Sequence, residues 1–214
     1  NGCKVKMGVL ERECFFLNRR FFTFHQKKRP YIILKWAESK DGYIAPKDPK
    51  KKYWLTSELS RQRVHQWRSQ EQGIMIGVKT AIFDNPKLTT RLWSGTNPVP
   101  IIIDPNQRIP KENIFKYQKK HFLIINFSKS NQKSSELSLK KILDFLHEHE
   151  IQSVIVEGGA VTLKHFVRNK LWDEAKVFKT NIELNEGTLS PRLNLKEKSV
   201  KEIGTDKLFH YSLD

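Results

Sequence analysis

Side chains that bind anions occur in a regular pattern near the middle of this sequence. Arg61, His65 and Arg68 are spaced so that a helix would place all of them on one face. Arginine presents paired N–H donors to phosphate or carboxylate oxygens, so this face suits an anionic ligand. A second polar group follows at residues 84–91 (DNPKLTTR). A solvated basic face and a plain Asx-Pro turn are the simpler interpretations, although such a turn has no use for Arg91.

A pair of glycines marks a third candidate, within residues 151–168. The β-branched run at residues 153–156 predicts a buried parallel strand, and helical spacing resumes after Gly158 and Gly159. Main-chain N–H groups at a helix start after such a turn can bind a phosphate. Glu157 would then face a ligand crevice at the carboxyl end of the strand. Two glycines alone also fit an ordinary tight turn.

Alternating strand and helix patterns must position these groups. Hydroxyl residues 56 and 57 predict a cap for a helix from about residue 58 to 70, and apolar spacing predicts helices over 78–83, 138–149 and 161–168. We also predict an amphipathic helix over residues 7–17. The predicted strands are residues 31–36, 74–76, 99–104, 121–126, 153–156, 174–180 and 208–212. This alternation predicts an α/β domain with a largely parallel sheet.

Composition narrows the class of protein. The chain has 214 residues and a formal net charge of +16, which raises a nucleic-acid-binding module as an alternative. The basic residues are spread along the chain rather than clustered, so a phosphorylated small molecule is the preferred ligand. No segment is apolar enough to predict a membrane span, and two cysteines do not make a disulfide framework. We therefore expect a cytoplasmic protein without membrane contact.

Other kinds of site find little support. His147 and His149 are two residues apart on a predicted helix and would point to different faces, so no metal site is predicted. The sequence has no zinc-deaminase signature, no nucleophile elbow, no Walker-type loop and no complete Gly-x-Gly-x-x-Gly fingerprint.

Taken together, the motifs resemble the reductase domain of the bifunctional riboflavin-biosynthesis deaminase-reductase. The resemblance is carried by residues 35–45 (KWAESKDGYIA), 53–56 (YWLT), 60–68 (SRQRVHQWR), 77–80 (GVKT), 84–91 (DNPKLTTR) and 156–159 (VEGG). Residues 1–29 resemble the tail of the deaminase domain and the linker, whereas residues 30–214 resemble the reductase domain. The zinc deaminase motifs of the family lie upstream and are missing from this sequence.

The resemblance implies a dihydrofolate-reductase-like α/β fold, with a mostly parallel central sheet flanked by helices. It implies an NADPH-dependent oxidoreductase that reduces the ribose of 5-amino-6-(5-phosphoribosylamino)uracil to a ribityl chain, without deaminase activity in this fragment. It also suggests a homodimer. A pterin reductase of the same fold is the alternative enzyme, but a pterin has no sugar phosphate for paired arginines to bind.

Site residues follow from the same resemblance, position by position. The predicted substrate contacts are Arg68, Leu88, Arg91 and Glu157. The predicted NADPH contacts are Ala37, Trp54, Thr80, Asp84, Gly159 and Ala160. Lys35 and Asp41, near the end of the first strand, are expected to assist proton transfer.

Overall fold

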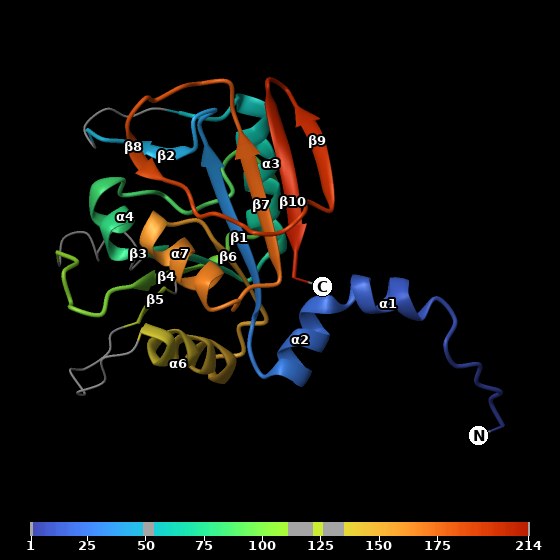
Figure 1. Ribbon diagram of the computed structural model, residues 1–214. Helices are drawn as coiled ribbons and strands as arrows, with labels where there is room; N and C mark the ends of the chain where they lie inside the picture. The colour runs from blue at the N-terminus through green and yellow to red at the C-terminus, as the bar shows by residue number, and fades with distance from the viewer. Residues whose placement is uncertain (1, 49–53, 111–121, 126–134, 214) are drawn as a thin grey trace.

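An eight-stranded sheet forms the centre of the computed structural model, which describes residues 2–48, 54–110, 122–125 and 135–213, with the main chain alone for 135–138 (Figure 1). The strand order is β5-β4-β3-β6-β1-β7-β10-β9. The bounds are β1 Tyr31–Glu38, β3 Gly73–Gly77, β4 Val99–Ile103, β5 Leu123–Ile125, β6 Ser153–Val156, β7 Glu174–Lys179, β9 Ser199–Ile203 and β10 Asp206–Ser212.

Most of this sheet is parallel, as the sequence predicts. All neighbouring pairs from β5 to β7 are parallel, and β10 and β9 complete the sheet as antiparallel strands. β6 lies between β1 and β3 although it follows both in the chain, so the strand order changes direction there. The carboxyl ends of β1, β3 and β6 therefore meet at one edge of the sheet, which is where open α/β sheets bind ligands.

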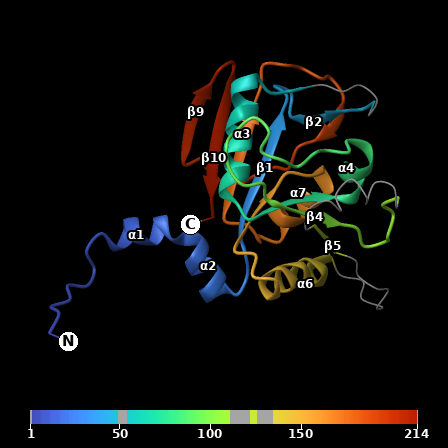
Figure 2. The ribbon, with the colours of Figure 1, turned by 180° about the vertical axis from the view of Figure 1, so that it is seen from behind.

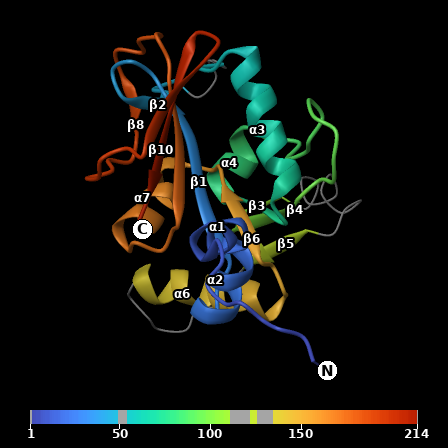
Figure 3. The ribbon, with the colours of Figure 1, turned by 90° about the vertical axis from the view of Figure 1, so that its right-hand side faces the viewer.

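Helices cover both faces of the sheet. α3 (Glu58–Gln70) and α4 (Val78–Phe83) pack over one apolar cluster, whereas α6 (Ser135–Glu148) and α7 (Ala160–Arg168) pack over the other. Figure 3 shows α3 and α4 on one side of the sheet and α6 and α7 on the other, and Figure 2 shows the molecule from behind. The central strands are buried on both faces because they are runs of β-branched and other apolar residues, as parallel strands between two helical layers require.

α3 begins where its cap residue predicts. The Ser57 side chain accepts a hydrogen bond from the Ser60 main-chain N–H at 3.3 Å, and the Ser57 N–H donates to Asp206 at 2.8 Å. The helix buries Ser60, Val64, His65 and Trp67 against the sheet. Arg61 and Arg68 are half-buried at the border of this face.

The N-terminal segment differs from the prediction. The expected helix over residues 7–17 is shorter, α1 (Glu11–Leu17), and none of its residues is buried. A second helix that the sequence pattern did not predict, α2 (Arg19–Lys27), packs against the body and buries Thr23 and Phe24. In Figure 1, α1 lies away from the sheet and α2 lies against it.

Ion pairs fix α2 and the residues after it to the body. Arginines of this segment form ion pairs with buried carboxylates: Arg19–Glu174 (2.8 Å), Arg20–Glu71 and Arg29–Asp173 (2.6 Å). The carboxylate side chains are 5%, 0% and 2% exposed. Burial alone would raise the pKa of Glu174, but His210, Lys176, Tyr31 and Arg19 outweigh it and hold that pKa well below its usual range. These ion pairs therefore hold α2 against the sheet and its neighbouring loops.

Three short strands were also missing from the prediction. β2 (Tyr43–Pro46) pairs with β8 (Gly187–Leu189) in a separate ribbon, and β9 forms one edge of the main sheet. Within the described ranges, every helix is too short or too polar to cross a bilayer.

Candidate functional site

The turns after β3 and β6 meet at the carboxyl edge of the sheet. A Cβ atom at Gly158 would lie 2.6 Å from the Cα atom of Ile76, closer than any real contact. Gly159 has a φ of +67°, and a Cβ atom there would lie 3.1 Å from the Thr80 hydroxyl. Both glycines are therefore required, one by close approach and one by backbone conformation. The turn therefore brings the start of α7 close to the Thr80 hydroxyl.

The chemistry of this turn fits a phosphate group. Gly159 caps α7, and no acidic residue lies in the first turn of the helix. The first main-chain N–H groups of a helix have no partner within the helix and carry partial positive charge, so they favour an anion. Ala160, half-buried, is the first helical residue. The structure thus brings together the predicted cofactor residues Thr80, Gly159 and Ala160.

Of the other predicted cofactor residues, Asp84 alone is hydrogen-bonded to this group within the described part of the chain. Asp84 ends α4, where its N–H donates to the Thr80 carbonyl at 3.0 Å. Ala37 lies on the carboxyl half of β1 and packs against the α3 side of the core. Trp54 precedes α3, is 66% exposed, and has the Arg61 guanidinium 5.1 Å from its ring centre. Trp54 therefore offers an open aromatic surface, whereas Ala37 is half-buried against the core.

A buried ion pair lies beside the glycine turn. Arg68 donates from Nε and Nη2 to the two oxygens of Glu157, at 2.7 and 2.8 Å. The side chains are 11% and 9% exposed. Arg68 Nη1 also donates to the Thr89 carbonyl at 2.9 Å. Arg68 thus links α3 to the end of β6 and to the turn before Arg91. Arg68 and Glu157, both predicted to bind substrate, are hydrogen-bonded to each other.

Charge in this cluster perturbs the pKa values. Burial alone would raise the pKa of Glu157, but Arg68, Lys35 and His65 outweigh it, and the pKa of Glu157 is lowered. Lys35 lies on β1, next to β6. Burial lowers the pKa of Lys35, Glu157 opposes this effect, and Arg68 adds to it. A lysine whose pKa is lowered by burial, beside a carboxylate, is a candidate for proton transfer.

Asp41, the other residue expected to transfer protons, is engaged elsewhere. Its carboxylate accepts hydrogen bonds from the Ser39 hydroxyl at 2.6 Å and from the Asn185 N–H at 2.7 Å. The Ser39 hydrogen bond is the main cause of a lowered pKa at Asp41, which burial opposes. An ionised carboxylate with these partners holds two loops together. Among the two candidates, the geometry therefore favours Lys35 as the proton-transferring group.

The turn that carries Arg91 is anchored in the core. Leu88 is 2% exposed and adopts a left-handed conformation with φ of 50°. The Thr90 N–H donates to the Asn97 side chain at 2.8 Å, which closes the loop behind it. Arg91 itself is exposed, and its pKa is lowered by partial burial and by the positive charges of Arg68 and Arg61. Leu88 thus holds the turn, while Arg91 adds an accessible positive charge to the cluster.

His65 adds a pH dependence to the stability. Burial and the charges of Arg68 and Arg91 lower its pKa to about 4, from 6.5 in the unfolded chain. As the pH falls below 6.5 the unfolded chain binds a proton that native His65 does not, so up to about 3 kcal/mol of stability is lost by pH 4. We expect urea unfolding between pH 7.5 and 4.5 to show this loss, and His65→Gln to lack it. If the free energy of unfolding falls by the same amount in both proteins over this pH range, the pH dependence does not come from His65.

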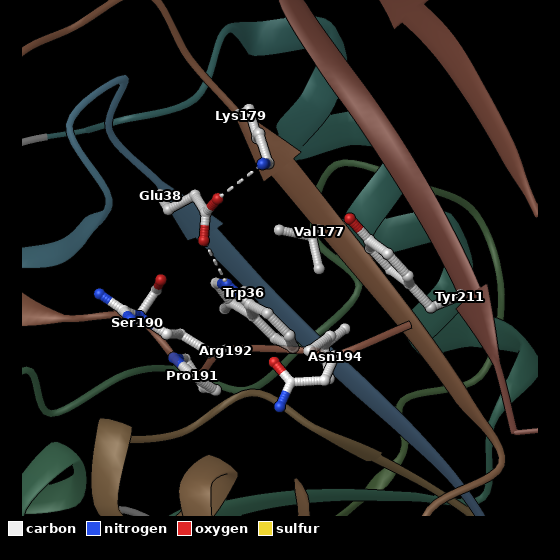
Figure 4. Close-up of a pocket in the computed structure, with 10 residues that line it drawn as sticks. Trp36, Glu38, Val177, Lys179, Ser190, Pro191, Arg192, Asn194 and Tyr211 are labelled. Atoms are coloured by element: carbon white, nitrogen blue, oxygen red, sulfur yellow. Dashed lines mark hydrogen bonds and ion pairs between the residues drawn. The ribbon is translucent and has the colours of Figure 1, made fainter. Parts of the chain in front are cut away.

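A separate cavity lies on the opposite face of the sheet (Figure 4). It has a volume of about 260 Å³ and is lined by residues that include Trp36, Glu38, Lys179 and Tyr211. Glu38 accepts from Trp36 Nε1 at 3.0 Å and pairs with Lys179 at 3.3 Å, as the dashed lines in Figure 4 show. Successive residues of β1 point to opposite faces, so this cavity and Lys35 lie back to back. Its carboxylate already has its partners, and we place the candidate site on the Lys35 side.

Residues 30–209 match the family model described as the RibD C-terminal domain. The chain belongs to the RibD C-terminal domain family. The riboflavin biosynthesis protein RibD of Aquifex aeolicus (strain VF5) is 33% identical over 233 residues, which cover 98% of this chain and 65% of that protein. The chain therefore spans less than two thirds of that relative. This family membership confirms the resemblance that the sequence motifs carry.

Solved structures agree with this family. A diaminohydroxyphosphoribosylaminopyrimidine deaminase/5-amino-6-(5-phosphoribosylamino)uracil reductase from Thermotoga maritima has a TM-score of 0.78 and 29% identity, covering 95% of this chain and 62% of that one. Dihydrofolate reductase from Enterococcus faecalis, complexed with NADP(H), has a TM-score of 0.54 and 15% identity, covering 86% and 97%. The second likeness concerns the fold alone. It confirms the predicted dihydrofolate-reductase-like architecture of this RibD domain.

Some features of the site were missing from the sequence interpretation. The spacing of Arg61, His65 and Arg68 indicated a shared face, but gave no sign that His65 is buried at 3% exposure. The Thr89 carbonyl, which anchors the Arg91 turn, has no sequence signal because it belongs to the main chain. Among the described residues, no group of histidine, cysteine or acidic side chains is arranged to hold a metal ion.

Proposed function

We propose that this RibD domain reduces the ribose of 5-amino-6-(5-phosphoribosylamino)uracil to the ribitylamino product with NADPH. One observation carries the proposal: a glycine turn at a helix start lies beside a cluster of Lys35, Arg68 and Glu157 at one edge of the sheet. The first feature suits a dinucleotide and the second suits a charged, proton-demanding substrate. Their proximity supports transfer between two bound molecules.

The residues present fit NADPH. The start of α7 and the Thr80 hydroxyl would hold its phosphates, because the glycine turn brings that hydroxyl and the first N–H groups of α7 together. Ala37 and Asp84 would border it, and Trp54 would cover one side with its exposed indole ring. When bound, NADPH supplies the hydride for the reduction. Excluding water and aligning the two ligands is the contribution of the protein.

Lys35 supplies the acid chemistry in this proposal. Opening the ribose ring breaks the bond between C1′ and the ring oxygen, and that oxygen must gain a proton. Its lowered pKa and the neighbouring Glu157 support Lys35 as the donor of the proton to this oxygen. Glu157 stays ionised through its pair with Arg68 and so keeps the lysine ammonium available.

Arg91 is the residue that we assign to the 5′-phosphate of the substrate. Arg68 is engaged by Glu157 and Thr89, whereas Arg91 is exposed at the same positively charged edge. We expect Arg91→Ala to raise the substrate KM because the phosphate loses a charged partner. The increase should correspond to a loss of binding free energy on the order of 2 to 4 kcal/mol. Steady-state kinetics, with the NADPH Kd from fluorescence titration, measure both effects. The NADPH Kd should change little.

Arg63→Ala is the matched control for this substitution. Arg63 is exposed on the outer side of α3 and hydrogen-bonds Gln66 at 2.6 Å. Arg63→Ala removes the same charge as Arg91→Ala, but from an exposed position on α3 outside the cluster. A KM for Arg91→Ala that equals the Arg63→Ala value would place the phosphate elsewhere.

A further inference from the structure

Arg91 alone supplies too little charge to match a phosphate group. A phosphate monoester carries a charge of about −1.5 to −2 at neutral pH. Arg68, the other arginine that the family resemblance implies at the substrate, is neutralised because it donates to both oxygens of Glu157. A phosphate bound to Arg91 alone would therefore keep about half of its charge unmatched. A second free cation is expected at the site.

Arg61 is an arginine on the same helix that no acid neutralises. It is half-buried near the start of α3, and within the described residues its guanidinium forms no ion pair. The guanidinium lies over the Trp54 ring, 5.1 Å from the ring centre. Such a cation–π contact restrains the side chain but provides no acceptor oxygen, so the N–H donors of Arg61 stay available for an anion.

The position of Arg61 on α3 places it on the face that borders the candidate site. Seven residues separate it from Arg68, which is about two helical turns and a rise of roughly 10 Å, so the two arginines share one face. Arg68 Nη1 donates to the Thr89 carbonyl at 2.9 Å, and so the turn that carries Arg91 lies against this face. Burial and Arg68 are the main causes of the lowered pKa of Arg91, and the positive charge of Arg61 contributes to it as well.

We propose that Arg61 is a second phosphate-binding residue, which together with Arg91 binds the 5′-phosphate of the substrate. The inference rests on the assignment of Arg91 to that phosphate in the proposed function. Arg61 takes the place of Arg68 in the pair of arginines, because Arg68 is bound to Glu157. The two free arginines match the charge of a phosphate dianion. The Trp54 ring holds Arg61 in place before the ligand binds, which lowers the entropy lost on binding.

Binding of inorganic phosphate, measured by calorimetry, tests the inference without turnover. We expect Arg61→Met to weaken phosphate binding about 10-fold or more, since a hydrogen bond between charged groups contributes that much. Arg61→Lys keeps the charge but loses the paired donors, so it should stay within about fivefold of the wild type. Arg63→Met is the matched control. Arg63 is exposed on the same helix and hydrogen-bonds Gln66, so its loss should change the phosphate affinity less than about twofold.

Two further measurements identify the ligand that carries the phosphate. In Arg61→Met the KM for 5-amino-6-(5-phosphoribosylamino)uracil should rise about 10-fold or more, whereas the Kd of NADPH, from fluorescence titration, should change less than about twofold. A loss of affinity for NADPH that NADH does not share would instead place the 2′-phosphate of the cofactor at Arg61 and overturn the assignment to the substrate. Equal phosphate affinity in Arg61→Met and Arg63→Met would overturn the binding role altogether.

Failure of this inference can be told apart from failure of the proposed function. A wild-type chain that binds inorganic phosphate through Arg61 without oxidising NADPH would overturn the proposed reduction and leave the role of Arg61 standing. A wild-type chain that binds no inorganic phosphate would overturn the role of Arg61. If Arg61→Met does not fold, Arg61→Gln removes the charge with a polar side chain and carries the same expectation.

Discussion

Arg68→Met should lower the free energy of unfolding by about 3–5 kcal/mol, because it leaves the buried Glu157 carboxylate without its partner. Arg68 is 11% exposed and donates two hydrogen bonds to Glu157 and one to the Thr89 carbonyl. Without it, burial would raise the pKa of Glu157 and favour the protonated acid. Urea unfolding at pH 7 measures the loss of stability, and kcat/KM should fall by at least about 100-fold.

The double variant Arg68→Met/Glu157→Leu tests the reason for that loss. Replacing both members of a buried pair with apolar side chains is often neutral or stabilising, so much of the lost stability should return. Activity should not return, because Lys35 would still lack its carboxylate neighbour. A single variant as stable as the wild type would show that the pair contributes nothing to folding.

Removal of residues 1–28 should destabilise the domain by about 4–7 kcal/mol. The truncation takes away Arg20, whose carboxylate partner Glu71 has 0% side-chain exposure, and so leaves a buried charge unpaired. It also removes Phe24, which is 8% exposed and contributes apolar burial of about 2 kcal/mol. Chemical unfolding of the truncated and complete chains measures the difference.

Truncation of residues 1–17 provides the control. It removes α1, which buries no residue, and keeps α2 with Arg19 and Arg20. The free energy of unfolding should stay within about 1 kcal/mol of the complete chain, as expected for an exposed helix. If both truncated proteins unfold at the same denaturant concentration, α2 is not part of the folded body.

The regular layers of the fold could be predicted because each segment reports its own surroundings. Apolar β-branched runs predicted strands such as β6, and the Ser57 cap predicted the start of α3. By contrast β9, with the sequence SVKEI, has no apolar face to mark it. It is a strand because β10 pairs with it. Likewise α2 depends on carboxylates more than fifty residues away, such as Glu71, which no local pattern reveals.

The site shows the same division. Motifs marked Arg68 and Glu157 as ligand contacts, but gave no sign that they bind each other across 89 residues of sequence. The family resemblance also suggested Asp41 as a proton-transfer residue. Its hydrogen bonds to the main chain of residues 184 and 185 could not be predicted from the sequence, because they join distant segments. Residue type and order thus indicate which groups gather at the site. Their partners, and therefore their charge states, follow from packing.

The central proposal is tested most directly by mixing the purified chain with NADPH and 5-amino-6-(5-phosphoribosylamino)uracil. The loss of NADPH absorbance should equal the ribitylamino product formed, measured by mass spectrometry. A matched reaction with Lys35→Met should be slower by at least about 100-fold, since a general acid contributes that much or more. A wild-type chain that binds both compounds but leaves NADPH unoxidised would contradict the proposed function.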